Sequence, residues 1–312
     1  MPLNTPFPHF GEAMALLAAI IFSWTSVLFT TAGQRLGVTL VNLLRLPGAA
    51  ICLGLSHLAL TGHIYPQGVA LSDQLWIGLS GIVGLAIGDS ALFRAFITIG
   101  PRRSMTLMAL APVFTVIIAW STLGERLGLW AIVGIVTVIA GVIVATRGRT
   151  GGGHFADLEP SVLTRGLLLG LVASAGQGLG SVFAKMGMTG TSAESLGVDP
   201  LGATLIRLVW AAGAYWLLVL PQQNLRTLFR PLRDRIGAGA MAGAILFGPF
   251  ISVWLSLVAI KNTEAGIAQV LLGTVPIFVV MPSWLVYKDR PTPMVLAGIV
   301  IAVAGSGLLF LR

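Results

Sequence analysis

Two opposite charges lie inside an apolar stretch of the chain. Asp89 and Arg94 fall within "GLAIGDSALFRAFITIGPRRSM", residues 84–105. A charge at the centre of a bilayer costs roughly 2.5–3.5 kcal/mol, so in a membrane these side chains must face something other than lipid. Three roles fit Asp89: a proton-coupling carboxylate, a partner for the ammonium group of a substrate, or a member of an ion pair. Residues five apart on a helix point about 140° away from each other, which makes Arg45 a better partner than Arg94.

Other reactive residue types are too sparse for intramembrane or metal-dependent catalysis. The sequence "AIGD" at 86–89 departs from a GxGD aspartyl protease motif at Ala86, and no second mid-span aspartate follows. The four histidines are scattered, without an H-E-x-x-H motif. The single cysteine, Cys52, excludes a disulfide framework within one chain and a Cys-rich metal site. We therefore expect neither an enzyme nor a bound cofactor or metal.

The elements that must position Asp89 are membrane helices. Hydrophobic residues make up 56% of the 312 residues and charged residues only 10%, against about 25% charged in a soluble domain. The apolar residues fall in blocks long enough to cross about 30 Å of hydrocarbon as helix. The sequence predicts an all-α integral membrane protein with ten transmembrane helices, at residues 11–31, 38–60, 75–98, 103–122, 128–147, 163–185, 200–220, 236–259, 265–287 and 292–311. The net charge is +8, and the charged residues lie mainly in the loops between spans. This placement favours a role in setting the orientation of the helices in the membrane over nucleic-acid binding.

The chain contains an internal repeat. A shift of 164 residues places Pro112 on Pro276 and Trp120 on Trp284, and a shift of 162 places Arg45 on Arg207. Equivalence of the two arginines favours a structural task for both. Chance apolar similarity rarely aligns proline, tryptophan and charged positions in order. The repeat predicts three parts: a first repeat at 1–147, a linker at 148–162 and a second repeat at 163–312.

Each repeat holds five predicted spans, so the second must enter the membrane from the opposite side. Equivalent loops differ in charge, as inversion requires: the loop after the second span has no Lys or Arg, whereas its counterpart has Arg226, Arg230, Arg233 and Arg235. One side collects 12 basic residues and the other 4. The positive-inside rule then places both termini outside the cytoplasm. Inverted repeats are typical of secondary transporters, which expose a central site to each side in turn.

These features resemble the drug/metabolite transporter superfamily, of the EamA type. The resemblance rests on "P-x-F" at 112–114 and 276–278, on the acidic-Arg turns "LGERL" at 123–127 and "YKDRP" at 287–291, and on the Gly-rich fifth spans "GIVTVIAGVIV" at 134–144 and "GIVIAVAG" at 298–305. It covers nearly the whole chain and implies ten helices around a central cavity. In the second turn Asp289 stands where the family usually has glutamate. Acids at these turns, Glu125 and Asp289, suit the N-terminus of the following helix.

The resemblance makes spans 1, 3, 4, 6, 8 and 9 central, and their polar, sulfur-containing or aromatic side chains are the candidate cavity residues. Together with Asp89 they are Ser23, Trp24, Met105, Met108, Gln177, Ser181, Trp254, Gln269 and Thr274. Arg94 lies close enough to its span end to reach the interface, as an alternative to a role beside Asp89 and Arg45. Pro112, Pro249 and Pro276 interrupt helical hydrogen bonding within their spans, so we expect kinks or hinges there.

The sequence and the resemblance together predict a multi-pass secondary transporter of the cell inner (plasma) membrane. A lining with few charges suits an amino acid or similar zwitterion, exported or facilitated by alternating access. A lipid-linked sugar flippase or another metabolite carrier of the same superfamily is the alternative. We expect the small-molecule substrate and membrane lipid as partners, no nucleic acid, and a monomeric protein. The driving ion and the direction of transport stay open.

Overall fold

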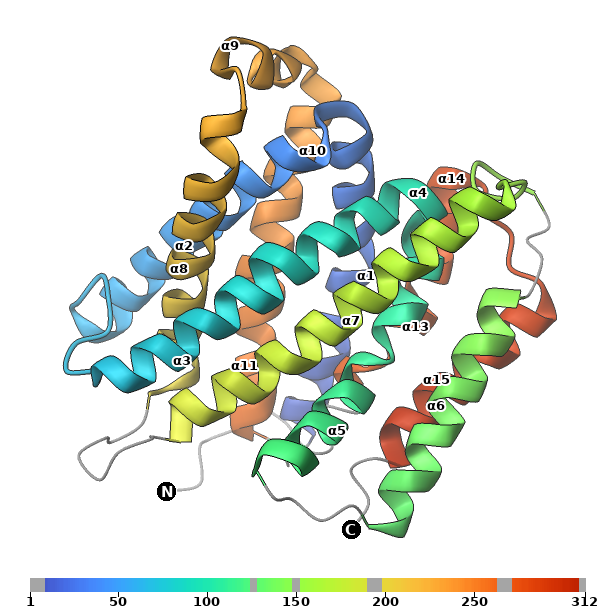
Figure 1. The fold of residues 1–312 in the computed structure, drawn as a ribbon, viewed down its shortest axis with the longest axis horizontal. Helices are drawn as coiled ribbons and strands as arrows, with labels where there is room; N and C mark the ends of the chain where they lie inside the picture. Colours follow the sequence, from blue (N-terminus) through green and yellow to red (C-terminus); the bar gives the residue numbers. More distant parts are fainter. Residues whose placement is uncertain (1–8, 124–127, 148–151, 190–197, 263–270, 309–312) are drawn as a thin grey trace.

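The described residues of a computed structural model, which are 9–123, 128–147, 152–189, 198–262 and 271–308, form helices joined by turns and irregular connections (Figure 1). The first half contains α1 Phe10–Leu36, α2 Val38–Thr61, α3 Leu71–Gly81, π-helix η1 Ile82–Gly88, α4 Asp89–Met108, α5 Ala111–Leu123 and α6 Leu129–Arg147. The second half contains α7 Pro160–Thr189, α8 Pro200–Val219, η2 Leu220–Gln222, α9 Leu225–Leu228, η3 Arg230–Arg233, α10 Arg235–Ile245, π-helix η4 Leu246–Ser252, α11 Val253–Asn262, α13 Val275–Phe278, α14 Val280–Tyr287 and α15 Pro293–Leu308.

Six helical segments of this described part are long and apolar enough to cross a membrane. They are Phe10–Leu36, Val38–Thr61, Leu71–Met108, Pro160–Thr189, Pro200–Val219 and Arg235–Ser256. Three shorter apolar helical segments are Ile132–Thr146, Val275–Tyr287 and Pro293–Leu308. The protein is therefore a multi-pass, all-helical membrane protein. The expected loop at 221–235 differs from the prediction, because it contains the short helices η2, α9 and η3.

The boundary between the third and fourth predicted spans is a sharp turn at Gly100. Helical residues continue through it from Asp89 to Met108, but Gly100 has φ 85° and ψ 160°, a backbone conformation that L side chains rarely adopt. A Cβ atom at this position would also lie 2.7 Å from the Phe155 ring. Pro101 then restarts the helix with a φ already suited to a first turn. The predicted division near residues 98–103 therefore corresponds to a real change of direction.

Interruptions recur in the two halves at a spacing of 164 residues. The π-helix η1, residues 82–88, has its counterpart in η4, residues 246–252. A short turn at residues 109–110 has its counterpart at residues 273–274. Pro112 and Pro276 were expected inside their spans, but each lies in the first turn of a new helix, α5 or α13, directly after the break. Pro249 lies inside η4.

Two close helix pairs organise the bundle. The long helix α7 packs along α3, η1 and α4, and α6 packs against α15 (Figure 1). Glycines permit the second contact: a Cβ at Gly141 would lie 2.3 Å from the backbone nitrogen of Ala302, and one at Gly298 would lie 2.3 Å from that of Ala145. Small residues let membrane helices approach until backbones touch. The first-half helix α6 is thus joined to the second-half helix α15.

An exposed ion pair joins α1 to α10 at the end of the bundle that carries α9. Arg35 Nη1 lies 2.9 Å from Asp234 Oδ2, and Asp234 Oδ1 accepts hydrogen bonds from the backbone of Ile236 and Gly237 as the N-cap of α10. The Arg35 guanidinium, followed by the Gly237 N–H, lowers the pKa of the Asp234 carboxyl. This contact places Arg35 on the same side of the bundle as the arginines of the α8–α10 connection.

Candidate functional site

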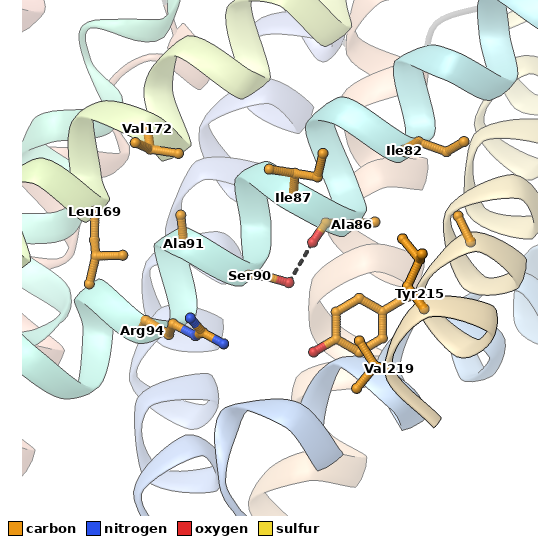
Figure 2. A pocket seen from close by; sticks show the side chains of 12 residues that line it. Ile82, Ala86, Ile87, Ser90, Ala91, Arg94, Leu169, Val172, Tyr215 and Val219 are labelled. Atoms are coloured by element: carbon orange, nitrogen blue, oxygen red, sulfur yellow. Dashed lines mark hydrogen bonds between the residues drawn. The ribbon is translucent and has the colours of Figure 1, made fainter. Parts of the chain in front are cut away.

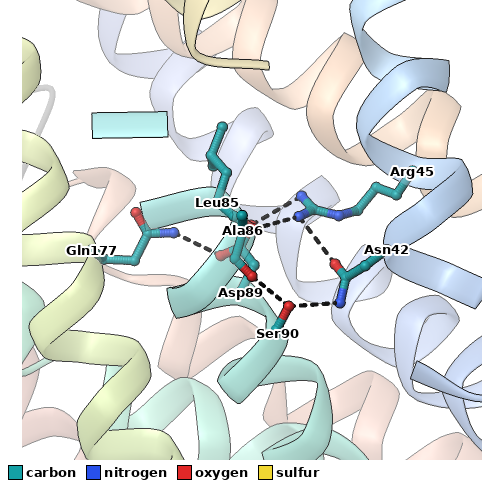
Figure 3. A network of polar contacts seen from close by, with 7 residues as sticks. All are labelled: Asn42, Arg45, Leu85, Ala86, Asp89, Ser90 and Gln177. Atoms are coloured by element: carbon teal, nitrogen blue, oxygen red, sulfur yellow. Dashed lines mark hydrogen bonds and ion pairs between the residues drawn. The ribbon is translucent and has the colours of Figure 1, made fainter. Parts of the chain in front are cut away.

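A buried polar network surrounds Asp89, at the junction of η1 and α4 (Figure 3). Asp89 is 6% exposed, and each of its carboxylate oxygens has a partner from a different helix. Arg45 Nη1 of α2 lies 2.9 Å from Oδ2, and Gln177 Nε2 of α7 donates to Oδ1 at 2.8 Å. The carboxylate therefore links α4 to α2 and α7 within segments that are otherwise mostly apolar.

Arg45 is held on several sides. Its Nη2 donates to the Leu85 carbonyl of η1 at 3.2 Å and to Asn42 Oδ1 at 3.4 Å. Its guanidinium carbon lies 4.8 Å from the centre of the Phe93 ring, a distance at which a cation is attracted by the ring face. Buried charges are tolerated when they are paired and hydrogen-bonded, and Arg45, 4% exposed, meets that condition except at Nε, which has no partner among the described residues.

The network extends along α4 to Ser90. Asn42 Nδ2 donates to Ser90 Oγ at 3.2 Å, and the Ser90 hydroxyl donates to the Ala86 carbonyl of η1. Two backbone carbonyls of one π-helix, those of Leu85 and Ala86, thus accept from network side chains. π-Bulges inside α-helices are frequent at functional sites. The network therefore depends on the local winding of η1 as well as on the charged groups.

A second arginine faces the same carboxylate without bonding to it. Arg207 of α8 interacts electrostatically with Asp89. Its Nη2 would lie 3.3 Å from a Cβ at Gly84, and Gln177 Oε1 would lie 3.5 Å from that point, so the absence of a side chain at Gly84 leaves room for both. The buried Nε of Arg207 has no hydrogen-bond partner in the part of the chain that the structure describes. Within those residues, two arginines, Arg45 and Arg207, therefore interact with the single carboxylate of Asp89.

Asp89 pairs with Arg45 and not with Arg94. The Asp89 ion pair is made with Arg45, the residue that helical geometry favours. Arg94 is exposed, and it lines a groove on the flank of the bundle (Figure 2). The equivalence of Arg45 and Arg207 in the repeat has a spatial counterpart, because both face Asp89 from different halves.

Most of the other predicted cavity residues are not gathered around this network. Ser23 of α1 is buried and donates to the Ile20 carbonyl of its own helix at 2.6 Å, and Trp24 is exposed. Met105 and Met108 of α4 pack against the core cluster that contains Phe93. These hydroxyl and thioether groups are therefore accounted for by local bonding and packing.

The remaining candidates are likewise spread over the second half. Ser181 is exposed and donates to the Gln177 carbonyl, and Thr274 donates to the Leu271 carbonyl at the break before α13. Trp254 of α11 is exposed. Gln269 lies outside the described residues, as does Glu125. Of the predicted set, Asp89, Arg45 and Gln177 are the ones whose side chains the structure brings together from different helices.

Asn42, Ser90 and Arg207 join the network although the candidate cavity list lacks them. Asn42 and Arg45 are three residues apart on α2, a spacing that puts side chains on one helix face, and Ser90 adjoins Asp89 in sequence. Arg207 could have been found from the internal repeat, which makes it equivalent to Arg45. A polar residue three positions from a charged residue on the same membrane helix, as Asn42 is from Arg45, could therefore have been predicted to join the network.

A second buried ion pair links the two halves outside this network. Asp289, which follows α14, accepts from Arg102 Nε at 2.9 Å and from Nη2 at 3.1 Å, and both side chains are 1% exposed. Next to it, Arg103 Nη1 donates to the Phe155 carbonyl at 2.6 Å. The sequence suggested that Asp289 serves the following helix N-terminus, whereas the structure gives its carboxylate to Arg102.

A third contact lies beside this pair. The Tyr287 hydroxyl lies 2.9 Å from the hydroxyl of Thr31 on α1, and the Tyr287 ring meets Phe155 at a centroid distance of 5.3 Å. Side chains from α1, α14 and the connection before α7 therefore pack together at one end of the bundle. No cluster of three or more His, Cys, Asp or Glu residues able to hold a metal occurs in the part of the chain described.

Comparisons with known proteins bear on both halves. The model of the EamA-like transporter family matches residues 9–147 and again residues 164–311. The fold is similar to that of a protein of known crystal structure, with a TM-score of 0.61 and 16% sequence identity over 96% of this chain and 94% of the other. A comparison with curated proteins found no match.

Proposed function

Because the chain belongs to the EamA-like transporter family, which matches it in two successive repeats, we propose that it is a secondary transporter that moves an amino acid or similar small zwitterion by alternating access. Membership of the family makes it a membrane transporter of small molecules; the substrate class and the mechanism are the proposal. The observation that carries the proposal is Arg207, whose Nε is buried beside the Asp89 network and which forms no ion pair within the described residues.

Ten spans in two inverted repeats are part of the proposal. Five spans per repeat reverse the orientation of the second repeat, and the charge difference between equivalent loops fits that reversal. The recurrence of a π-helix and of a helix break at a spacing of 164 residues supports two copies of one structural plan. Two such copies can exchange conformations and so open a site between them to either side.

The charges of the network favour a ligand with a carboxylate. Asp89 is bound by Arg45 and Gln177, which leaves Arg207 as the described cation of the network able to receive an anionic group. A guanidinium binds a carboxylate through two parallel hydrogen bonds. The ammonium group of a zwitterion would be attracted by Asp89 nearby. An amino acid therefore matches the signs of the charges better than a simple cation.

The first test is uptake of a mixture of labelled amino acids into proteoliposomes. We expect Arg207→Gln to lower the initial rate about tenfold, the effect of losing one charge-assisted hydrogen bond of roughly 1.5 kcal/mol. Arg230→Gln, which removes an exposed arginine from η3, is the matched control and should transport like the wild type. Equal loss in both variants would contradict the role of Arg207. Absence of amino-acid uptake by the folded wild type would contradict the substrate class and favour the lipid-linked sugar flippase.

The same vesicles test Asp89 when a pH gradient is imposed. In this structure a proton on Asp89 would cancel the negative charge that pairs with Arg45. We therefore expect wild-type uptake to be independent of the gradient, and Asp89→Asn to slow it because Arg45 loses its counter-ion. The opposite pattern, a wild-type response to the gradient that disappears in Asp89→Asn, would make Asp89 the proton-coupling group and the protein a driven transporter.

A further inference from the structure

A groove runs along the flank of the bundle between α4, α7 and α8 (Figure 2). Its volume is about 410 Å³. Its apolar wall includes Ile87, Val172 and Leu218, which are 55%, 50% and 66% exposed. Large aliphatic side chains with that exposure, on helices that cross a membrane, face the hydrocarbon. The groove therefore opens sideways to lipid, whereas the Asp89 network lies behind it, with Ser90 lining the groove and bonded to the network.

One part of the groove is polar and cationic. Figure 2 shows the guanidinium of Arg94 and the hydroxyl groups of Ser90 and Tyr215 turned toward the same space. Among the residues that the structure describes, none forms an ion pair with Arg94. A guanidinium at the surface of a membrane helix is stabilised when it reaches the phosphate layer. The position of Arg94 along the helix decides whether it can do so.

The length of the groove matches one leaflet of a bilayer. Its lining residues on η1 and α4 extend from Ile82 to Arg94, about 18 Å of helix at 1.5 Å per residue. Half of a hydrocarbon core is about 15 Å. Arg94 precedes Arg102 and Arg103 on α4, so it lies toward the basic end, which the positive-inside rule assigns to the cytoplasm. The groove thus begins near the cytoplasmic headgroups and extends to about the middle of the membrane.

We propose that this groove binds one phospholipid with an anionic headgroup from the cytoplasmic leaflet, its phosphate on Arg94 and one acyl chain against Ile82 and Ile87. A partner helix would need an apolar face across both leaflets, whereas this groove extends across one. Anionic lipids gather in the cytoplasmic leaflet and are attracted by basic side chains at its surface. The lipid would lie against Ser90 and so against α4 at the Asp89 network, where its presence stabilises that arrangement of α4, α7 and α8.

Native mass spectrometry of the purified full-length protein tests the proposal. The probes are palmitoyl-oleoyl phosphatidylglycerol, which is anionic, and palmitoyl-oleoyl phosphatidylcholine, which is zwitterionic, added in equal amounts. We expect the wild type to retain the anionic lipid preferentially. Arg94→Gln should lower that preference about fivefold, the factor expected for one cation facing an anionic lipid. Arg94→Lys should keep most of it, because the charge remains.

Two matched variants separate the groove from general surface charge. Arg165→Gln removes another exposed arginine, on α7 and outside the groove lining, and should leave the lipid preference unchanged. Ala214→Phe fills the groove beside Tyr215 and should lower retention of both lipids. Retention by Arg94→Gln equal to that of the wild type would overturn the proposal. So would an equal loss in Arg165→Gln, because lipid binding would then follow net charge alone.

Discussion

Asp289→Ala should lower the free energy of unfolding by about 3–5 kcal/mol, the range for removing one partner of a buried ion pair. The carboxylate receives two hydrogen bonds from Arg102, and both side chains are 1% exposed. Without Asp289 the guanidinium would stay buried and lose its counter-charge. Thermal unfolding in detergent, followed by the fluorescence of the tryptophans, measures the effect as a large drop in melting temperature.

The control for this variant removes an ion pair of the same kind from the surface. Asp234→Asn breaks the exposed pair with Arg35 and keeps an N-cap for α10, so its melting temperature should stay close to that of the wild type. The double variant Arg102→Met, Asp289→Leu should recover much of the lost stability, because an apolar pair replaces the unpaired charge. Wild-type melting of Asp289→Ala would contradict the buried pair.

Gly298→Leu should separate α6 from α15. Even a Cβ at Gly298 would lie 2.3 Å from the backbone nitrogen of Ala145, and a backbone cannot move aside as a flexible side chain can. Overpacking in a well-packed interior costs about 1–3 kcal/mol when the surroundings adjust, and a clash with backbone requires the helices themselves to part. We therefore expect the free energy of unfolding to fall by more than about 3 kcal/mol, the upper end of the overpacking range. Size-exclusion chromatography should then show little folded protein.

Gly213→Leu is the matched control, because nothing lies within 4 Å of a Cβ at that position on α8. The two variants add the same side chain to glycines within helices, so their intrinsic helix propensities cancel. A Gly298→Leu protein that elutes and melts like Gly213→Leu would show that α6 and α15 do not pack at this distance.

Amino-acid composition and the pattern of apolar residues predicted most of the architecture. Apolar block length predicted ten membrane helices, and six segments of the described residues are long and apolar enough to cross a membrane. The family model matches the chain twice, at residues 9–147 and 164–311. The predicted boundary between the spans 75–98 and 103–122 coincides with the turn at Gly100. The prolines at 112 and 276 signalled interruptions, although each helix breaks just before its proline.

The candidate site was predictable only in part, for a physical reason. In a membrane helix the lipid-facing side is as apolar as the packed side, so periodicity does not say which way Trp24 or Trp254 points, and both are exposed. Asp89 and Arg45 were identified because charged groups must find partners in such surroundings, and Gln177 because it is a polar side chain on a span that the family resemblance makes central. Arg102 and Asp289 pair across 187 positions, and nothing in the local sequence of either residue indicates the other.

The pairing of α6 with α15 also has a consequence for the biosynthesis of the protein. The ribosome must continue from the end of α6 at Arg147 to the end of α15 at Leu308, which takes roughly 10–30 s at 5–20 residues per second. Throughout that interval the glycine-rich face of α6 has no partner helix and must be covered by lipid or by the insertion machinery. The nascent first half is therefore most open to wrong helix pairing, and to membrane quality control, before the last helix emerges.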